Sequence, residues 1–151
     1  MWAHVYFFKG KLLFPSVASI GGPAYLEIEP VEVLSLKEAT PERIASVLAT
    51  VHARGNPRIP APGRGNFPKH VVLRPAGARS QREFERGSRL WTIRIEGDTM
   101  ELTPWRPRPD RGREPWSERT EHFEGEGAAL ALARRLLEQI EEGEEPGPAY
   151  A

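Results

Sequence analysis

The amino-acid sequence predicts a single α+β domain, in which two main amphipathic helices and a short third helix cover a mostly antiparallel sheet. Three observations support this fold class. Two pairs of apolar runs are joined by glycine-containing turns, two segments repeat apolar residues at helical spacing, and the two hairpins lie too far apart for a simple alternation of strands and helices. The chain has 151 residues, enough for one buried core. We expect the domain to span residues 1–143 and residues 144–151 to form a flexible tail.

The first expected element is a β-hairpin near the N-terminus. Apolar runs at 5–8 and 12–14 flank Lys9 and Gly10, and the glycine supplies the positive φ that a two-residue turn needs. Pairing across this turn sets Tyr6 opposite Leu13, so apolar side chains lie on both faces of the hairpin. We therefore expect these strands at the centre of the sheet, covered on both sides.

A further strand is expected over residues 25–33. Apolar and acidic residues alternate up to Glu29, and the alternation resumes in the opposite phase after Pro30. Because proline cannot donate a hydrogen bond to a neighbouring strand, we expect a bulge or a sheet edge at Pro30. Alternation along a half-buried strand also predicts that Glu27, Glu29 and Glu32 lie on its wet face.

The first amphipathic helix is expected to begin at Thr40 and end at Gly55. The Thr40 hydroxyl suits the capping position, Pro41 suits the first helical position, and Glu42 suits the positive end of the helix dipole. Its buried face follows the spacing i, i+3, i+4 and i+7 and consists of Ile44, Val47, Leu48 and Val51.

The middle of the chain is expected to be less regular. Residues 56–69 contain four prolines and two glycines, which predicts an irregular loop, and residues 71–73 are expected to form a short strand. Ser80 and Glu83 match a capping box, in which each side chain accepts a hydrogen bond from a backbone N–H near the helix start. They predict a short helix that buries Phe84 and ends at Gly87.

A second hairpin is expected around Gly97 and Asp98. If these two residues form the turn, Ile93 faces Leu102, and the pair lies on the buried side of the hairpin. The same register satisfies three more pairs, one of them buried and two on the opposite face: Ile95 with Met100, Arg94 with Glu101, and Thr92 with Thr103.

The C-terminal third is expected to hold a loop and a helix. Four prolines and an arginine-rich run between residues 104 and 116 argue against a helix or a central strand, so we expect an exposed loop. A helix is then expected over residues 126–142, because its apolar positions share one stripe: Ala129, Ala133, Leu136, Leu137 and Ile140.

Composition excludes several classes of protein. No apolar stretch approaches the ~20 residues of a membrane-spanning helix, and the absence of cysteine excludes disulfides and cysteine-based zinc sites. The N-terminus lacks the pattern of an export signal, so we expect a cytoplasmic protein. The net charge is zero, but residues 54–119 hold fifteen Lys and Arg against eight acids. This basic middle raises a nucleic-acid hypothesis, although the acidic segment after residue 119 offsets it.

Patterns typical of catalysis or metal binding are weak. The four histidines, at positions 4, 52, 70 and 122, never occur at the short spacings of metal-binding motifs. No serine lies in a nucleophile elbow, and the loop at 62–69 lacks the spacing of a phosphate-binding loop. We therefore predict a protein that is not an enzyme, with no catalytic residue, no metal site and no cofactor.

Five segments, in matching order between residues 5 and 110, resemble the immunity proteins of bacterial contact-dependent growth inhibition systems. These are small cytoplasmic inhibitors that protect a producing cell from its own delivered toxin. The matching segments are Gly10-Lys11-Leu12 with Pro15, the strand at 25–33, Ala53–Pro57 with Pro60 and Pro62, Phe67–Leu73, and Phe84–Arg86 with Trp91.

The resemblance implies stoichiometric binding to the C-terminal domain of a cognate toxin, which in such systems is often a nuclease. A membrane partner is not expected. Acidic side chains suit the basic cleft of a nuclease, and a proline-bounded loop loses little entropy on binding. The candidate binding residues are therefore Glu27, Glu29 and Glu32, with the acids at 121–126, and, in the loop, Arg64, Asn66, Phe67 and Lys69.

Two alternatives remain open. One is a nucleic-acid-binding module that uses the basic loop Arg106–Arg113 with Trp105 and Trp116, because arginines contact phosphates and indole rings stack on bases. The other, an enzyme of unrecognised type, has the least support from the residues.

Overall fold

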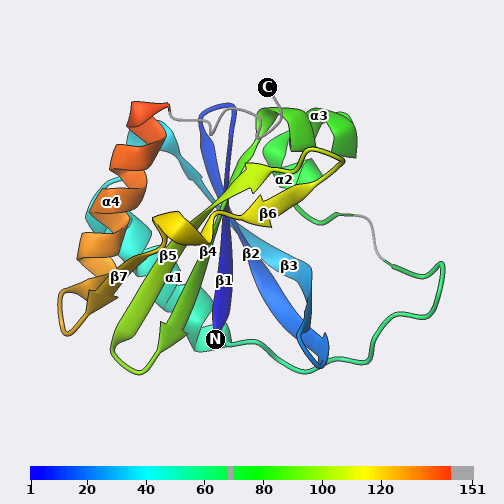
Figure 1. Ribbon diagram of the computed structural model, residues 1–151, viewed down its shortest axis with the longest axis horizontal. Coiled ribbons are helices and arrows are strands. Elements are labelled where there is room, and N and C mark those ends of the chain that lie inside the picture. The colour runs from blue at the N-terminus through cyan, green and yellow to red at the C-terminus, as the bar shows by residue number, and fades with distance from the viewer. Residues whose placement is uncertain (68–69, 144–151) are drawn as a thin grey trace.

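The computed structural model describes residues 1–67 and 70–143 and confirms the α+β fold class (Figure 1). Residues 144–151, where a tail was predicted, lie outside the described residues. The sheet has seven antiparallel strands in the order β3-β2-β1-β4-β5-β6, and β7 pairs with β5. The strands are β1 (Trp2–Phe8), β2 (Lys11–Gly21), β3 (Ala24–Ser35), β4 (Arg89–Glu96), β5 (Thr99–Pro107), β6 (Arg113–Pro115) and β7 (Glu121–Glu124). The helices are α1 (Pro41–Arg54), α2 (Leu73–Ala76), α3 (Gln81–Gly87) and α4 (Ala128–Glu142), with 3-10 turns η1 (Leu36–Glu38) and η2 (Ser117–Arg119).

The opening hairpin lies at the centre of the sheet, as predicted. Strand β1 pairs with β2 on one side and with β4 on the other, and Tyr6 faces Leu13 across the first hairpin. The β1–β2 ladder extends only to this pair. Beyond it the side chain of Asn56 joins the two strands, because it accepts a hydrogen bond from Trp2 N–H and donates to the carbonyls of Trp2 and Val17.

Helices α1 and α4 cover one face of the sheet (Figure 1). The predicted helix caps explain where α1 begins and ends, because Thr40 accepts a hydrogen bond from Arg43 N–H and Gly55 follows the last turn with a positive φ. The main core lies between these helices and the strands. Its largest buried members include Leu12, Phe14, Ile44, Leu48, Trp91, Ile93, Leu102, Leu132 and Leu136.

Helices α2 and α3 cover only one end of the opposite face (Figure 1). The Ser80 hydroxyl accepts a hydrogen bond from Glu83 N–H, as the capping box predicts, but the Glu83 carboxylate accepts from Arg79 N–H instead of Ser80 N–H. Phe84 lies beneath α3 in a second, smaller core with Tyr6, Phe8, Leu13, Val72 and Ala76. The remainder of this face carries the hollow described below.

The second hairpin has the predicted register. Strands β4 and β5 pair Ile93 with Leu102, Ile95 with Met100, Arg94 with Glu101, and Thr92 with Thr103. Ile93, Ile95 and Leu102 are buried, whereas Met100 is half-buried and pairs with Phe123 of the neighbouring strand β7.

Pro30 coincides with both features predicted for it. The peptide bond from Glu29 to Pro30 is cis, and the β2–β3 register shifts beside it. Strand β3 also lies at the edge of the sheet. The shift explains why the alternation of apolar residues changes phase at this proline.

Two predicted elements are wrong. Instead of the strand expected at 71–73, residues 71–72 lead into helix α2, which begins at Leu73, and Val72 is its capping residue. Three adjacent apolar residues fit a buried helical turn as well as a strand, and Gly77, with a φ of 74°, ends the turn. The predicted loop at 104–116 also contains the end of β5 and all of β6. Pro115 is tolerated because β6 is an edge strand.

Helix α4 starts at Ala128, two residues after the predicted start, and is the longest helix in the described residues. Across residues 1–67 and 70–143, no helix combines the length and the apolar character needed to cross a membrane.

Candidate functional site

A hollow on the sheet face opposite α1 and α4 is the first candidate site. The strand register aligns His4 of β1 with Thr92 of β4, and Thr92 with Thr103 of β5. The β2–β3 turn and the segment around η2 form the rim. We call this concavity the sheet hollow. The side chains that line it include Trp2, His4, Tyr25, Thr92, Thr103 and Trp105.

A buried carboxylate lies beside the sheet hollow. Glu27 reaches inward from β3, and its Oε2 accepts a hydrogen bond from the Tyr6 hydroxyl at 2.7 Å and lies 2.6 Å from His4 Nδ1. The other oxygen, Oε1, lies 2.7 Å from Nε2 of His70. The Glu27 side chain is only 10% exposed. We call Tyr6, His4, Glu27 and His70 the histidine–glutamate cluster.

Burial and hydrogen bonding act on Glu27 in opposite directions. Burial alone raises the pKa of the carboxyl group, but the contacts from His4, His70 and Tyr6 favour the charged form more strongly and lower the pKa to about 2. Burial, together with the nearby Glu27 charge, raises the pKa of Tyr6 well above its usual value. At neutral pH Glu27 is therefore a carboxylate that only accepts hydrogen bonds, so His4 Nδ1 and the Tyr6 hydroxyl donate to it.

Helix α3 holds the aromatic members of the cluster in place. The Phe84 ring centroid lies 5.1 Å from that of Tyr6 and 5.6 Å from that of His70. Tyr6 and His70 themselves meet edge to face, with centroids 5.9 Å apart. Such ring contacts fix side-chain orientation. The geometry of the cluster is therefore set by β1, β3 and α3 together.

The cluster is a network of direct contacts. His4 Nδ1 lies at hydrogen-bond distance from Glu27, at 2.6 Å, and His70 Nε2 contacts the other carboxylate oxygen at 2.7 Å, so neither contact leaves room for a cation between the groups. In the two described ranges, no three His, Asp or Glu side chains are grouped as metal ligands. The histidine–glutamate cluster can therefore hold the His4 imidazole in a fixed orientation at the border of the sheet hollow.

The predicted acidic residues lie in three different environments. The wet-face prediction is wrong for Glu27, because its side chain contacts His4 and Tyr6 of β1 and His70 instead of solvent. Glu29 is exposed. Glu32 is half-buried and forms an ion pair with Arg54 of α1.

The predicted loop residues are mostly exposed. Arg64, Asn66 and Phe67 are all on the surface, and Asn66 N–H donates to Gly63 carbonyl across a tight turn. Lys69 lies outside the described residues. Phe67 is brought to the histidine–glutamate cluster, where it lines a second, smaller hollow with Glu27 and His70.

Two exposed aromatic residues border this region. Tyr25 is 39% exposed and Phe67 is 58% exposed, which is high for side chains of this size. Tyr25 lines both hollows, as do His4 and Tyr6. The two hollows therefore form one continuous surface with the histidine–glutamate cluster at their junction.

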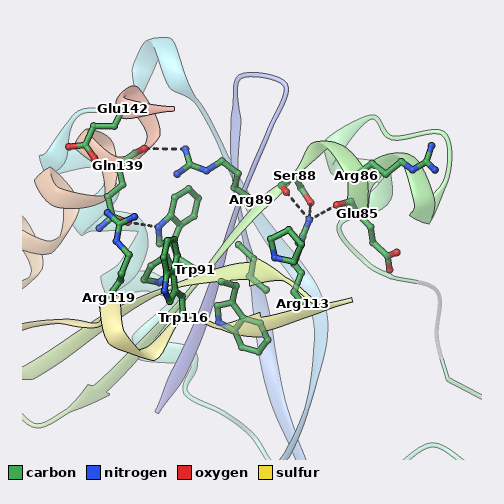
Figure 2. A pocket seen from close by; sticks show the side chains of 14 residues that line it. Glu85, Arg86, Ser88, Arg89, Trp91, Arg113, Trp116, Arg119, Gln139 and Glu142 are labelled. Atoms are coloured by element: carbon green, nitrogen blue, oxygen red, sulfur yellow. Dashed lines mark hydrogen bonds between the residues drawn. The ribbon is translucent and has the colours of Figure 1, made fainter. Parts of the chain in front are cut away.

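A separate pocket lies between the C-terminal end of α4, the start of β4 and strand β6 (Figure 2). We call it the arginine–tryptophan pocket. Figure 2 shows Arg89, Arg113 and Arg119 around Trp91 and Trp116. The guanidinium of Arg89 lies 4.7 Å from the Trp91 ring centroid and donates to the Gln139 carbonyl, while Trp91 Nε1 donates to Gln139 Oε1.

Three of the four arginines of the nucleic-acid alternative form hydrogen bonds or ion pairs within the protein. Arg106 pairs with Glu114 across β5 and β6, and Arg108 pairs with Asp110. Arg113 donates to the Glu85 and Ser88 carbonyls and to the Ser88 hydroxyl. The indole N–H of Trp105 donates to Thr92, and the Trp116 ring is contacted by two guanidinium groups. The exposed arginine face expected for phosphate binding is therefore reduced.

Several residues of these sites were not singled out from the sequence. His4 and His70 lie 23 and 43 residues from Glu27, so no local spacing joins them. One signal was present, since His4 and Tyr6 are polar residues on the same face of an otherwise apolar strand. Arg89 and Gln139 meet only through the packing of α4 against β4 and had no such signal.

Comparison with known proteins adds information about the fold alone. The sequence matches no known protein family and no curated protein. Among solved structures, a protein of unknown function from Neisseria meningitidis is similar, with a TM-score of 0.64 and 11% sequence identity. The similarity covers 92% of this chain and 93% of that one. The described fold therefore recurs in a protein of distant sequence.

Proposed function

We propose that this chain is an immunity protein that binds a cognate growth-inhibition toxin domain and neutralises it by forming a stoichiometric complex. One observation carries the proposal. Tyr25 and Phe67 are exposed beside a continuous concave surface whose border holds a fixed charged cluster. Rigid aromatic anchors around a preorganised polar centre are typical of protein interfaces. The ordered resemblance of residues 5–110 to such immunity proteins supports the same reading.

The framework of the surface suits an inhibitor. The hollows rest on β1, β3, β4 and β5, and prolines restrict the adjoining loop, so little conformational entropy is lost when a partner binds. Glu29 is exposed on β3, two residues from Glu27, and suits a basic nuclease cleft. We propose the cytoplasm as the compartment, since the chain contains no cysteine that would require an oxidising one.

The test is co-expression with the toxin domain encoded by the neighbouring gene. The chain should restore growth and co-elute with that domain in size-exclusion chromatography, and a complex of this kind typically buries on the order of 1,600 Å². Replacing both Tyr25 and Phe67 by serine should abolish rescue. Val33→Ser is the matched control, because Val33 is also an exposed apolar residue of β3, 46% exposed, but lines neither hollow.

Two outcomes contradict the proposal. In one, the chain neither rescues growth nor co-elutes with the toxin domain. In the other, it binds RNA or DNA with an affinity that falls steeply as salt rises, which favours the nucleic-acid alternative. An unchanged rescue by the Tyr25 and Phe67 variant, with the control also active, would place the interface elsewhere.

A further inference from the structure

The lining of the sheet hollow combines aromatic rings with hydrogen-bond acceptors. The hollow measures about 650 Å³, and the rings of Trp2, Tyr25 and Trp105 contribute to its walls. Three threonines and a serine add hydroxyl groups to the same lining. A hollow of this size admits a side chain of a protein partner together with its flanking backbone, so the chemistry of the lining decides which side chain enters.

His4 supplies one of these acceptors. Its Nδ1 donates to the buried Glu27 carboxylate, so in the neutral imidazole the other nitrogen, Nε2, carries a lone pair. Within residues 1–67 and 70–143, Nε2 of His4 has no hydrogen-bond partner, and the buried polar atoms without a partner are Glu27 Oε1 and His70 Nδ1 instead. The Nε2 atom of His4 therefore reaches solvent, and the His4 side chain lines the sheet hollow.

The hydroxyl groups beside His4 are also acceptors. Thr92, which faces His4 across β1 and β4, accepts a hydrogen bond from Nε1 of Trp105 at 3.1 Å. The hydroxyls of Thr103 and Thr120 lie 2.8 Å apart, so one of them donates to the other. Because a hydroxyl oxygen has two lone pairs, each of these oxygens can still accept a hydrogen bond from an N–H group of a ligand.

The formal charge of the lining is negative. Among the described residues that line the sheet hollow, Glu101 is the one acid and none is lysine or arginine. Arg94 faces Glu101 across β4 and β5, but its guanidinium forms an ion pair with Glu96 and lies 5.9 Å from the ring centroid of Trp2. His122 Nδ1 lies 3.5 Å from Oε1 of Glu101 and carries a charge only when protonated, so Oε2 is left to accept from a ligand.

These features select a planar cation with several N–H donors. An apolar or acidic side chain would desolvate Glu101 and the hydroxyl groups without giving them a donor, which costs free energy. A guanidinium supplies those donors and stacks on aromatic rings, as the guanidinium of Arg94 does on Trp2, whereas an ammonium is compact and strongly hydrated. We propose that the sheet hollow receives an arginine side chain of the toxin domain. This inference rests on the proposed function and names the type of residue that anchors the complex.

The first experiment uses no toxin, so it does not depend on the proposed function. N-acetyl-arginine methylamide is titrated into the full chain at constant ionic strength, and NMR follows the indole N–H signals of the tryptophans. The Trp105 signal should shift, whereas that of Trp91, which is 1% exposed, should not. The citrulline analogue of the probe has nearly the same shape without the charge, and it should bind about tenfold more weakly or worse.

A substitution at Glu101 tests the acidic contact. Glu101→Gln should weaken binding of the arginine probe by about three- to tenfold, and it should weaken binding of the toxin domain as well. Glu141→Gln is the matched control, because it removes the same charge from an exposed position on α4, which covers the other face of the sheet. If Glu101→Gln does not fold, Thr103→Val takes its place, since it removes a hydroxyl acceptor with little change in shape.

The outcomes separate this inference from the proposed function. If the toxin domain binds the Glu101 and Glu141 variants equally well, the hollow does not receive an arginine, but the proposed function stands. Equal binding of the arginine and citrulline probes, or no shift of the Trp105 signal, would also overturn the inference. If the arginine probe binds through Glu101 and the toxin domain does not bind at all, the hollow still selects arginine, and the proposed function is wrong.

Discussion

Glu27 shows how a single residue departs from its sequence pattern. Alternation assigns it to solvent, yet its carboxylate is held by two histidines and a tyrosine from other parts of the chain. The Glu27 side chain therefore stabilises the fold at the border of the sheet, and it does not attract a basic partner through long-range charge. Charge reversal at this position would leave His4, Tyr6 and His70 facing a cation, so we expect misfolding there.

The pH dependence of stability provides a test at Glu27. Its pKa is about 2 in the folded chain and near 4.5 when unfolded, so the ionised form stabilises the fold by about 3 kcal/mol. Because the folded pKa is the lower one, this stability is present above pH 4.5 and is lost as the pH falls toward 2. Chemical denaturation of Glu27→Gln should show a loss of about 3 kcal/mol at neutral pH that shrinks as the solution is acidified.

Glu29→Gln is the control for this measurement, since Glu29 is an exposed carboxylate two residues away on the same strand. Its unfolding free energy should follow that of the original chain at each pH. A Glu27→Gln variant that loses stability equally at neutral and acidic pH would contradict the assigned ionisation.

At the scale of elements, the register of the β4–β5 hairpin follows most fully from the sequence, because the turn and all four predicted residue pairs agree. Ile93 is fully buried opposite Leu102, so Ile93→Ala should lower the unfolding free energy by about 2–5 kcal/mol through lost contacts and a cavity. Arg94→Ala, on the other face of the same strand, should cost less than about 1 kcal/mol. Thermal melting of both variants decides the prediction, and an unchanged melting temperature for Ile93→Ala would contradict burial.

The junction of α3 with β1 depends on a close approach. Gly87 ends α3 against the Phe8 ring, and an added Cβ would lie 2.9 Å from Phe8 Cε2. Gly87→Ala should therefore destabilise the fold by about 1–3 kcal/mol through overpacking. Gly127→Ala is the comparison, because Gly127 also lacks a positive φ and its added Cβ meets nothing within 4 Å. Denaturant midpoints that shift equally would show that the contact with Phe8 is not responsible.

Elements with local signals were predictable, and elements that depend on distant partners were not. The caps at Thr40 and Ser80 and the turn at Gly97 each rest on residues a few positions apart. By contrast, the end of β5 and strand β6 pair only because the chain reverses around Gly112, where prolines had indicated a loop. Helix α2 was likewise predicted as a strand, because Val72 has a high β propensity. In the folded chain Val72 is buried, and its packing outweighs that propensity.

The candidate sites were predictable only in part, for the same reason. Phe67, which the sequence singled out, lines a hollow, but the partners of Glu27 come from β1 and from the segment after the loop. The arginine–tryptophan pocket needs Arg89 and Gln139, which lie 50 residues apart. Sequence spacing carries no information about contacts of this range.

For the whole molecule, charge placement predicts how the proposed complex forms. Glu29 is exposed, so Glu29→Lys should slow association with the toxin domain at low salt by about tenfold or less and leave the melting temperature unchanged. The difference should fade as salt screens the charge. Stopped-flow association rates measure the effect. An Asp98→Lys variant, at the exposed turn between β4 and β5, is the control for a change in net charge alone.

The placement of β1 has a consequence for synthesis of the chain. This strand is synthesised well before β4, around residues 89–94, which lies on one side of it, and on the other side its ladder with β2 is continued by Asn56. Until β4 has been synthesised, the nascent chain therefore exposes one apolar edge of its central strand. During that interval β1 depends on other means of protection from misassociation with neighbouring chains.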